Sequence, residues 1–389
     1  MSTATRQTSR SKLEPLRFAH PFFTPTPPDR RPTTPFGRRM MDHVQEHLQP
    51  IPRPKRPPMM TLADIVGAQN ATDIEQSGTL RFHSVGDTGR GADSPQGEVA
   101  NAMAGDFDVS HPARSPAFFF HLGDVIYGHS KDQQYRQEFY EPYMHYPGKI
   151  IAIPGNHDGE VFPQKDPVTL RAFLANFCAA TAQVPPIAGT IFRQTMTQPG
   201  VYWRLDAPFV DVIGLYSNVG EGPGFISGPI PGQAQKTWLV SMLRTIGKAR
   251  ATGKRKGLIL ATHHPPFSNA GHAGSPELLQ DLDDACDQAG VMPDLFLAGH
   301  SHTYQRYTRR ITFAGKKLEV PFVVAGIGGI NDQPVPNATG QISGDHSFDA
   351  SHQGFGYLLV EATATNVEVR AIDVGGTQKA EVDHVRVNF

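Results

Sequence analysis

The feature that most constrains the fold of this 389-residue chain is a regular alternation of short apolar runs with longer amphipathic ones. The short runs have the length of strands, whereas the longer segments repeat apolar residues at three- and four-residue spacing, as helices do. Strands separated by helices in this way are typical of an α/β domain. The runs that we expect to form strands are residues 80–85, 117–122, 149–153, 209–216, 257–261 and 294–298.

Helices are expected between these strands, and the pattern changes towards the end of the chain. Residues 310–326 and 355–374 alternate around Gly and Lys turns, which indicates antiparallel strands closing a second sheet. We therefore predict a single domain of residues 59–389, an α/β/β/α sandwich of two stacked mixed β-sheets flanked by helices. Its motif-bearing core would be residues 80–305, and its closing strands residues 310–389. The expected helices are residues 131–144, 170–181, 233–250 and 276–289.

The first 58 residues differ in composition from the rest of the chain. They hold 12 of the 34 prolines, and residues 1–60 carry 11 Lys and Arg against 4 Asp and Glu. Proline removes backbone donors and disfavours helix, so we predict a basic, disordered or extended tail (residues 1–58) with at most a short helix around residues 40–48. The tail lacks the aromatic-and-basic motif of a nucleic-acid module, which favours a solvated extension over nucleic-acid binding.

The sequence also argues against several broad classes of protein. Its apolar runs are far shorter than the roughly 20 residues that cross a bilayer, so we expect no membrane span. The first residues contain no apolar stretch of the kind found in secretory signals, and a cytoplasmic protein is therefore expected. Two cysteines, Cys178 and Cys286, are too few for a disulfide framework, and we expect buried thiols.

Side chains able to bind metal ions gather at or near the ends of the predicted strands. Because the carboxyl ends of strands in an open α/β sheet form one crevice, we expect these side chains to converge. They offer only oxygen and nitrogen, which suit Zn, Mn, Fe or Mg. Seven donors exceed the usual needs of one ion, whereas two ions that share one carboxylate would use them all. The seven are Asp87, Asp124, Tyr127, Asn156, His263, His300 and His302.

The motifs around these residues resemble those of the calcineurin-like metallophosphoesterases and, in detail, those of the purple acid phosphatases. The resemblance extends from about residue 80 to residue 373. It implies the metallo-dependent phosphatase fold and a phosphoesterase activity. The motifs in this sequence are Gly86-Asp87-Thr88-Gly89, Gly123-Asp124-Val125-Ile126-Tyr127, Gly155-Asn156-His157-Asp158, Thr262-His263-His264-Pro265 and Gly299-His300-Ser301-His302.

A paired departure from the superfamily pattern carries the narrower resemblance. Most members have a metal-binding histidine where this chain has Gly89, and Tyr127 would replace the lost ligand. In purple acid phosphatases a tyrosinate binds a ferric ion, so the resemblance implies iron at the first site and iron, zinc or manganese at the second. By resemblance, the ligands would be Asp87, Tyr127, His302 and the shared Asp124 for the first metal, and Asn156, His263, His300 and Asp124 for the second.

The same resemblance implies catalytic roles for two further histidines. His157 matches the family position whose imidazole contacts the phosphate and the leaving group. His272 lies nine residues after His263, where phosphatases of the tartrate-resistant type carry a substrate-facing histidine. The expected reaction is hydrolysis of a phosphate monoester, on a small molecule or a protein, by attack of metal-activated hydroxide on phosphorus, with acid phosphatase-like properties.

The motifs leave the substrate open. The same metal centre would serve a phosphodiesterase or a nucleotide hydrolase, because the ligands fix the reaction at phosphorus and not the other arm of the ester. Loops such as residues 159–200 and 220–232 must decide between these activities. A non-catalytic metal-binding scaffold is a third alternative, although no ligand position is replaced here. His264 is expected to point away from the ligands, since side chains alternate along an extended segment.

Overall fold

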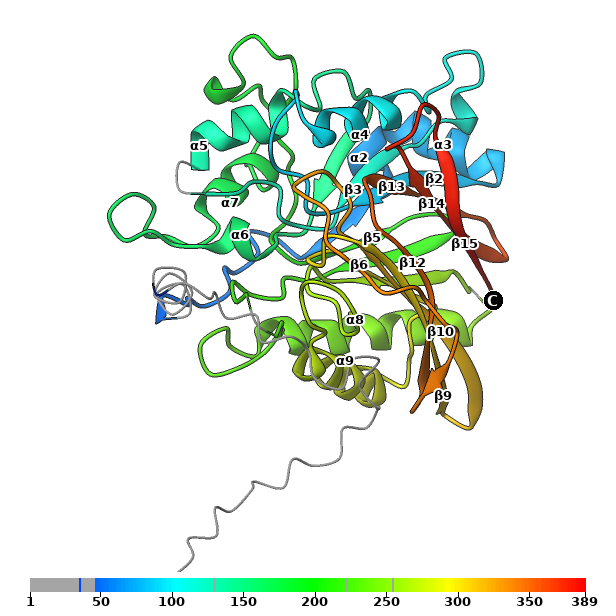
Figure 1. Ribbon diagram of the computed structural model, residues 1–389. Coiled ribbons are helices and arrows are strands. Elements are labelled where there is room, and N and C mark those ends of the chain that lie inside the picture. The colour runs from blue at the N-terminus through cyan, green and yellow to red at the C-terminus, as the bar shows by residue number, and fades with distance from the viewer. Residues whose placement is uncertain (1–34, 36–45, 129–130, 222, 254) are drawn as a thin grey trace, which may run out of the picture.

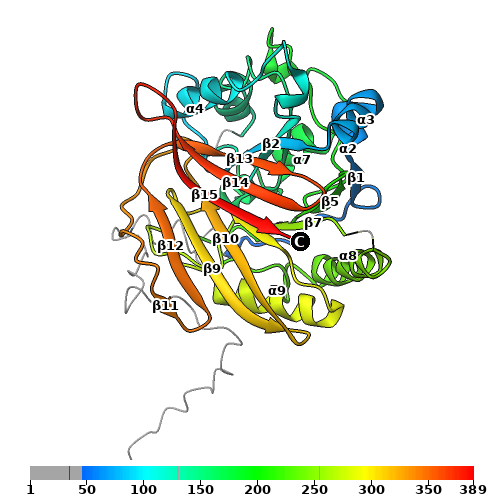
Figure 2. The same cartoon turned by 90° about the vertical axis from the view of Figure 1, so that its right-hand side faces the viewer.

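Two mixed β-sheets are stacked at the centre of the molecule, and helices cover the outer face of each sheet (Figure 1). The computed structural model describes residue 35 and residues 46–128, 131–221, 223–253 and 255–389. A view turned by 90° also shows the helices above one sheet and below the other (Figure 2). The predicted α/β/β/α sandwich is therefore confirmed.

The larger sheet has nine strands, in the order β1-β5-β6-β7-β8-β10-β9-β12-β11. Strands β6, β7, β8 and β10 run parallel, as apolar runs buried on both faces commonly do. Strands β9 and β12 continue the sheet in antiparallel fashion. The bounds are β1 (Met59–Thr61), β5 (Trp203–Asp206), β6 (Val210–Gly214), β7 (Gly257–Ala261), β8 (Leu295–Ala298), β9 (Tyr304–Phe313), β10 (Lys316–Ala325), β11 (Ile342–Ser343) and β12 (His346–His352).

The smaller sheet has six strands, in the order β15-β14-β13-β2-β3-β4. Strands β2, β3 and β4 are parallel, whereas β13, β14 and β15 form an antiparallel extension beside β2. The ring centroids of Phe120 on β3 and Trp203 on β5 are 5.2 Å apart, so these side chains pack between the two sheets. The bounds are β2 (Leu80–Val85), β3 (Phe118–His121), β4 (Lys149–Ala152), β13 (Gly356–Ala362), β14 (Asn366–Asp373) and β15 (Ala380–Asn388).

Helices α8 and α9 cover the larger sheet, and the remaining helices lie over the smaller one (Figure 1). Helix α9 has the predicted bounds, because Pro276 occupies its first turn and Gly290 ends it in the left-handed conformation, with φ 68°. The helices are α2 (Leu62–Val66), α3 (Ala68–Ser77), α4 (Pro95–Ala104), α5 (Lys131–Gln134), α6 (Asn156–Gly159), α7 (Arg171–Phe177), α8 (Ala234–Ala251) and α9 (Pro276–Ala289), with short 3₁₀ or π turns η1 (Pro112–Arg114), η2 (Tyr135–Tyr140) and η3 (Pro186–Ala188).

Two sequence-based expectations about these elements differ from the structure. The strands after residue 304 do not all close one sheet: β9 to β12 extend the larger sheet, and β13 to β15 extend the smaller. An alternating pattern indicates a strand but does not determine which strand pairs with it, because pairing depends on long-range packing. The helix expected at residues 131–144 is only α5, which continues as the π-helix η2.

The end of the predicted tail contacts the domain. Lys55 Nζ donates to the carbonyl of Cys178 at 2.6 Å, and Arg56 donates to the carbonyl of Thr197 at 2.7 Å. Residues 1–34 and 36–45 of the predicted tail, with most of the helix expected at residues 40–48, lie outside the described residues. Both cysteines are buried and free. Within the described part of the chain, no helix has the length and apolar character needed to cross a membrane.

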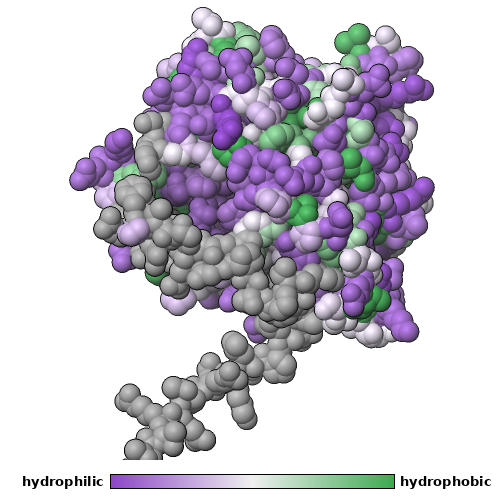
Figure 3. Space-filling model, in the orientation of Figure 1, coloured by the Kyte–Doolittle hydropathy of each residue, from purple (hydrophilic) through white to green (hydrophobic). Residues whose placement is uncertain are grey.

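Hydrophobic residues are scattered over the surface. On the face drawn in Figure 3, leaving aside the grey residues, green side chains appear in small separate groups among hydrophilic ones. Scattered apolar residues of this kind are normal on a folded protein and carry no functional meaning by themselves.

Candidate metal centre

The predicted metal ligands come from the carboxyl ends of strands in both sheets. Asp87, Asp124 and Asn156 follow β2, β3 and β4 of the smaller sheet. His263 and His300 follow β7 and β8 of the larger sheet. The stacking of the sheets therefore joins two rows of side chains into one site, as the position of their strands predicted.

Three of these residues have an uncommon backbone conformation. Asp87, Asp124 and His300 have φ values of 59°, 53° and 68°. Such values are disfavoured for residues other than glycine and persist only where the surroundings fix them. Hydrogen bonds do so here, because the Asp87 N–H donates to the carbonyl of Gly123 at 3.0 Å and the His300 N–H donates to Asp87 Oδ2 at 2.7 Å. These contacts fix the backbone at the strand ends in a strained conformation of the kind that is common at functional sites.

Four side chains of the predicted second metal site converge on one point. Asn156 Oδ1 lies 3.0 Å from His263 Nε2 and 3.0 Å from His300 Nδ1. His263 Nε2 is also 3.4 Å from Asp124 Oδ2. All four residues are buried. Bonds of about 2.0–2.2 Å to one cation place its nitrogen and oxygen ligands roughly 3 Å apart, so this donor set fits a metal ion.

The predicted first metal site lies directly beside the second. His302 Nε2 is 3.6 Å from Asp87 Oδ1, and the Tyr127 hydroxyl is 3.4 Å from the same oxygen. Asp87 Oδ1 is 3.9 Å from His263 Nε2, which joins the two groups of donors. All seven residues predicted from the sequence are therefore within one cluster.

The ring of Tyr127 occupies the space next to Gly89. A Cβ atom built on Gly89 would overlap the Cδ2 atom of the Tyr127 ring. The Tyr127 N–H donates to Glu138 Oε2 at 2.7 Å, which helps to hold this segment. A histidine in place of Gly89 is therefore incompatible with the observed tyrosine, and the two departures from the superfamily pattern depend on each other.

The buried acids and imidazoles strongly alter one another's pKa values. Burial raises the pKa of Asp87 to about 7, and the neighbouring Asp124 adds to this rise. Burial also opposes ionisation of Asp124, yet the charges of His263 and His157 outweigh it, and the pKa of Asp124 lies below its usual range. Burial lowers the pKa of His263, but Asp124 and Asp87 outweigh burial and raise it to about 9. Perturbed groups in one cluster are characteristic of functional sites.

His157 lies on the edge of this cluster. The backbone N–H of His157 donates to Asp124 Oδ1 at 2.9 Å, and the His157 ring centroid is 4.5 Å from that of Tyr127. Its Nδ1 is 3.0 Å from Glu160 Oε1, and its Nε2 is 3.4 Å from Glu221 Oε1. The His157 side chain is 26% exposed, so a substrate can reach it. Burial opposes its protonation, but Glu160 and Asp124 outweigh this effect and hold the pKa of His157 well above its ordinary value.

His272 and one residue not predicted from the sequence lie beside the candidate histidine ligands. The His272 ring centroid is 4.4 Å from that of His300 and 5.2 Å from that of His302. Gln333 donates its backbone N–H to the carbonyl of His302 at 3.1 Å, and its side-chain Nε2 is 3.5 Å from His302 Nδ1. Gln333 lies in an irregular segment without a motif, so the sequence offered no signal for it.

His264 turns both ring nitrogens towards a neighbouring loop, while its ring centroid lies 4.3 Å from that of His300. Its Nδ1 is 2.8 Å from the Ser217 hydroxyl, and its Nε2 is 2.8 Å from the carbonyl of Gly220. Burial lowers the pKa of His264 to about 3, so the ring is neutral at physiological pH. The loop that it holds carries Glu221, another site residue that no motif predicted.

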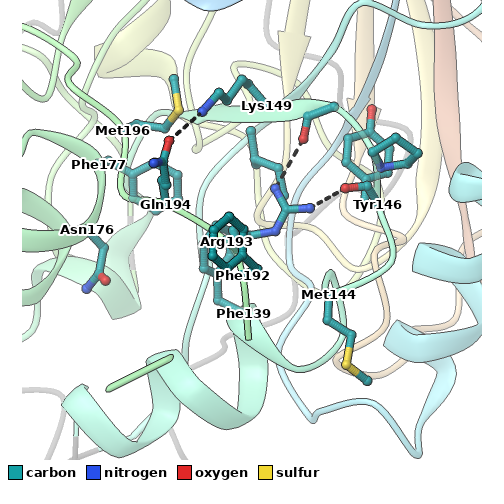
Figure 4. A pocket seen from close by; sticks show the side chains of 13 residues that line it. Phe139, Met144, Tyr146, Lys149, Asn176, Phe177, Phe192, Arg193, Gln194 and Met196 are labelled. Atoms are coloured by element: carbon teal, nitrogen blue, oxygen red, sulfur yellow. Dashed lines mark hydrogen bonds between the residues drawn. The ribbon is translucent and has the colours of Figure 1, made fainter. Parts of the chain in front are cut away.

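A separate cavity of about 250 Å³ lies elsewhere in the molecule (Figure 4). Arg193 lines it, and the guanidinium group donates to the carbonyls of Tyr143, Tyr146 and Gly148. These bonds engage the arginine within the protein, and none of the seven predicted metal ligands lines this cavity. The cluster at the strand ends is therefore the better candidate for a functional site.

Comparison with known families agrees with this site. The sequence model of the calcineurin-like phosphoesterase family matches residues 80–304. This stretch covers more than half of the chain, and the chain belongs to that family. The domain is accordingly a metallophosphoesterase domain. Membership implies two divalent metal ions and a phosphate ester substrate, and candidate ligand groups such as Asp124, His263 and His300 are present.

Solved structures support the fold. GAP50, described as the anchor in the inner membrane complex of Plasmodium, is 14% identical, with a TM-score of 0.51 over 80% of this chain and 89% of its own. The structure of PhoD is 12% identical, with a TM-score of 0.50 over 87% of this chain and 71% of its own. Similarities at these identities concern the fold alone. No curated protein sequence matches the chain.

Proposed function

We propose that this protein is a binuclear metal-dependent phosphatase of the purple acid phosphatase type, which hydrolyses phosphate monoesters with acid phosphatase-like properties. The observation that carries the proposal is the mutual exclusion between a side chain at position 89 and the ring of Tyr127. A chain that keeps the other ligands but exchanges the first histidine for a glycine has room for a tyrosine ligand. The Tyr127 hydroxyl lies 3.4 Å from Asp87 Oδ1, within reach of the same cation.

The proposed ligand sets follow the two groups of donors. Iron would occupy the first site, because a phenolate is a hard oxygen ligand and suits Fe³⁺, and iron, zinc or manganese would occupy the second. Asp124 would bridge them. The first set is Asp87, Tyr127, His302 and Asp124, and the second is Asn156, His263, His300 and Asp124.

The residues around the ions would bind and orient the substrate. Two cations bound here would supply a hydroxide nucleophile near neutral pH and neutralise the phosphoryl oxygens. His157 would contact the phosphate and hold a proton for the leaving alkoxide, with Glu160 fixing the ring through Nδ1. His272, beside His300 and His302, would contact the substrate as a second imidazole.

The test is to purify the protein aerobically, measure its visible spectrum and metal content, and assay an aryl phosphate monoester beside a diester. Tyr127→Phe is the matched variant, because it removes only the phenolic oxygen. A visible charge-transfer band that disappears in Tyr127→Phe, together with about two metals per chain and monoesterase activity, would establish the proposal.

Other results would overturn all or part of it. A colourless protein with two zinc or manganese ions and mainly diesterase activity would keep the metal centre but replace the phosphatase by a phosphodiesterase or nucleotide hydrolase. A protein that binds no metal and hydrolyses neither ester would leave only the scaffold alternative.

A further inference from the structure

Glu221 places a carboxylate beside two residues of the proposed active site. Its Oε1 accepts a hydrogen bond from Asn156 Nδ2 at 3.3 Å and lies 3.4 Å from His157 Nε2. The Oδ1 atom of Asn156 faces His263 and His300, so the carboxylate stands on the other side of the same amide. The Glu221 side chain is 30% exposed and therefore borders the space that a substrate enters.

A buried histidine, His264, holds the loop that carries Glu221. His264 Nε2 is 2.8 Å from the carbonyl of Gly220, and the Gly220 N–H donates to Asn218 Oδ1 at 2.6 Å. Asn218 itself has a φ of 84°, a conformation that requires such support. The position of Glu221 is thus set by buried contacts of the preceding residues.

The nearest cation to Glu221 is the His157 ring in its protonated form, and Glu221 then offsets a positive charge that would otherwise face an incoming phosphate. Lys131 is buried and donates to the carbonyl of His157, and its Nζ is 4.0 Å from Glu160 Oε2. It therefore balances Glu160, which binds the opposite nitrogen of His157. Glu221 faces Nε2 of His157, the nitrogen available for a phosphoryl oxygen or a leaving group.

We propose that Glu221 is a specificity-determining residue that disfavours the dianion of a phosphate monoester relative to monoanionic esters, which are the same monoester below its second pKa and a diester. A monoester carries a second negative charge above its second pKa of about 6, whereas a diester carries one charge only. A fixed carboxylate a few ångströms away repels the dianion more strongly than the monoanion. The inference rests on the proposed phosphoesterase function and names the charge of the ester that this site accepts best.

The experiment compares the metal-loaded wild type with Glu221→Gln on an aryl monoester and the matching aryl diester at about pH 8, where the monoester is dianionic. Glutamine keeps the acceptor for Asn156 Nδ2 and removes only the charge. The ratio of kcat/KM for the monoester to that for the diester should rise about tenfold in Glu221→Gln. Because both substrates report on the same active molecules, this ratio does not depend on the fraction that holds metal.

Two controls complete the test. Glu221→Asp keeps the charge and should leave the ratio near that of the wild type, and Glu75→Gln removes a carboxylate from the exposed surface of α3 and should not change it. Calorimetry of the same proteins with inorganic phosphate and with dimethyl phosphate supplies a readout without turnover. Glu221→Gln should bind the dianion about tenfold more tightly and the monoanion with little change.

The outcomes separate this inference from the proposed function. An unchanged monoester-to-diester ratio and unchanged phosphate affinity in Glu221→Gln would overturn the role of Glu221 and leave the phosphoesterase intact. If the wild-type protein hydrolyses neither ester, the proposed function is wrong. The affinities for phosphate and dimethyl phosphate would still decide whether Glu221 selects against the dianion.

Discussion

The ring of Tyr127 fills the space that any side chain at Gly89 would need. The two residues lie on different strand-end loops, one after β2 and the other after β3. Their contact explains how a glycine and a tyrosine at distant positions form one structural unit. It also makes the proposed first metal site sensitive to the smallest possible substitution at position 89.

Gly89→Ala should therefore displace Tyr127 and destabilise the protein by about 1–3 kcal/mol, as overpacking of a dense region usually does. Urea unfolding of the metal-free protein measures this cost. In a Tyr127→Ala background the same substitution should cost much less, because the overlapping ring is gone. Equal costs in both backgrounds would contradict the proposed contact. Gly375→Ala, which meets only Asp373 at 3.7 Å, serves as a control with little expected effect.

His263→Ala should reduce the bound metal from about two ions per chain to about one and lower phosphoesterase activity at least about 100-fold. His263 is proposed to bind the ion directly, and even the loss of a residue that only supports a ligand costs about 10–100-fold. The adjacent His264→Gln is the matched control. Both ring nitrogens of His264 are engaged by Ser217 and Gly220, and its ring only packs against that of His300 at 4.3 Å, so it offers no donor atom to an ion and this variant should retain both ions. Metal analysis of the two variants would refute the ligand assignment if their losses were the same.

The buried His121 should make stability fall in acid. Burial lowers its pKa to about 3 from 6.5, so the unfolded chain takes up this proton at a higher pH than the folded protein. The resulting stability is fully present above pH 6.5 and is lost as the pH falls towards 3, by about 1.4 kcal/mol per pH unit. Urea unfolding between about pH 7.5 and 5.5 should show a smaller loss for His121→Gln than for the wild type. Parallel pH profiles would disprove this contribution.

A buried ion pair joins α9 to β9. Arg309 donates two hydrogen bonds to Asp283, both of 2.9 Å, and the two side chains are 1% and 3% exposed. Asp283→Ala leaves the guanidinium with Asp345 but without its bidentate partner, and should cost about 3 kcal/mol. Glu319→Ala, which breaks the exposed pair with Arg310, should cost less than about 0.5 kcal/mol. Similar unfolding midpoints for the two variants would show that burial of the pair adds nothing.

The positions of the candidate ligands were predictable because they depend on local pattern. Apolar runs of strand length mark the strands, and polar residues that follow them must meet where the carboxyl ends of parallel strands lie. Asp87, Asp124, Asn156, His263 and His300 satisfy this rule, and the structure brings them together with Tyr127 and His302. The predicted two-sheet sandwich follows from the same alternation of strands and helices.

Residue types and their spacing along the chain were therefore enough to predict the sandwich, most of its strands and helices, and the candidate donor atoms. Spacing along the chain does not show that β9 to β12 join one sheet and β13 to β15 the other, or that Glu160, Glu221 and Gln333 surround the candidate ligands. Strand partners and loop positions are instead fixed by packing between distant segments. A glutamate in an irregular loop has no periodic signal, and buried contacts such as that of His264 with Gly220 place it beside the candidate metal ligands.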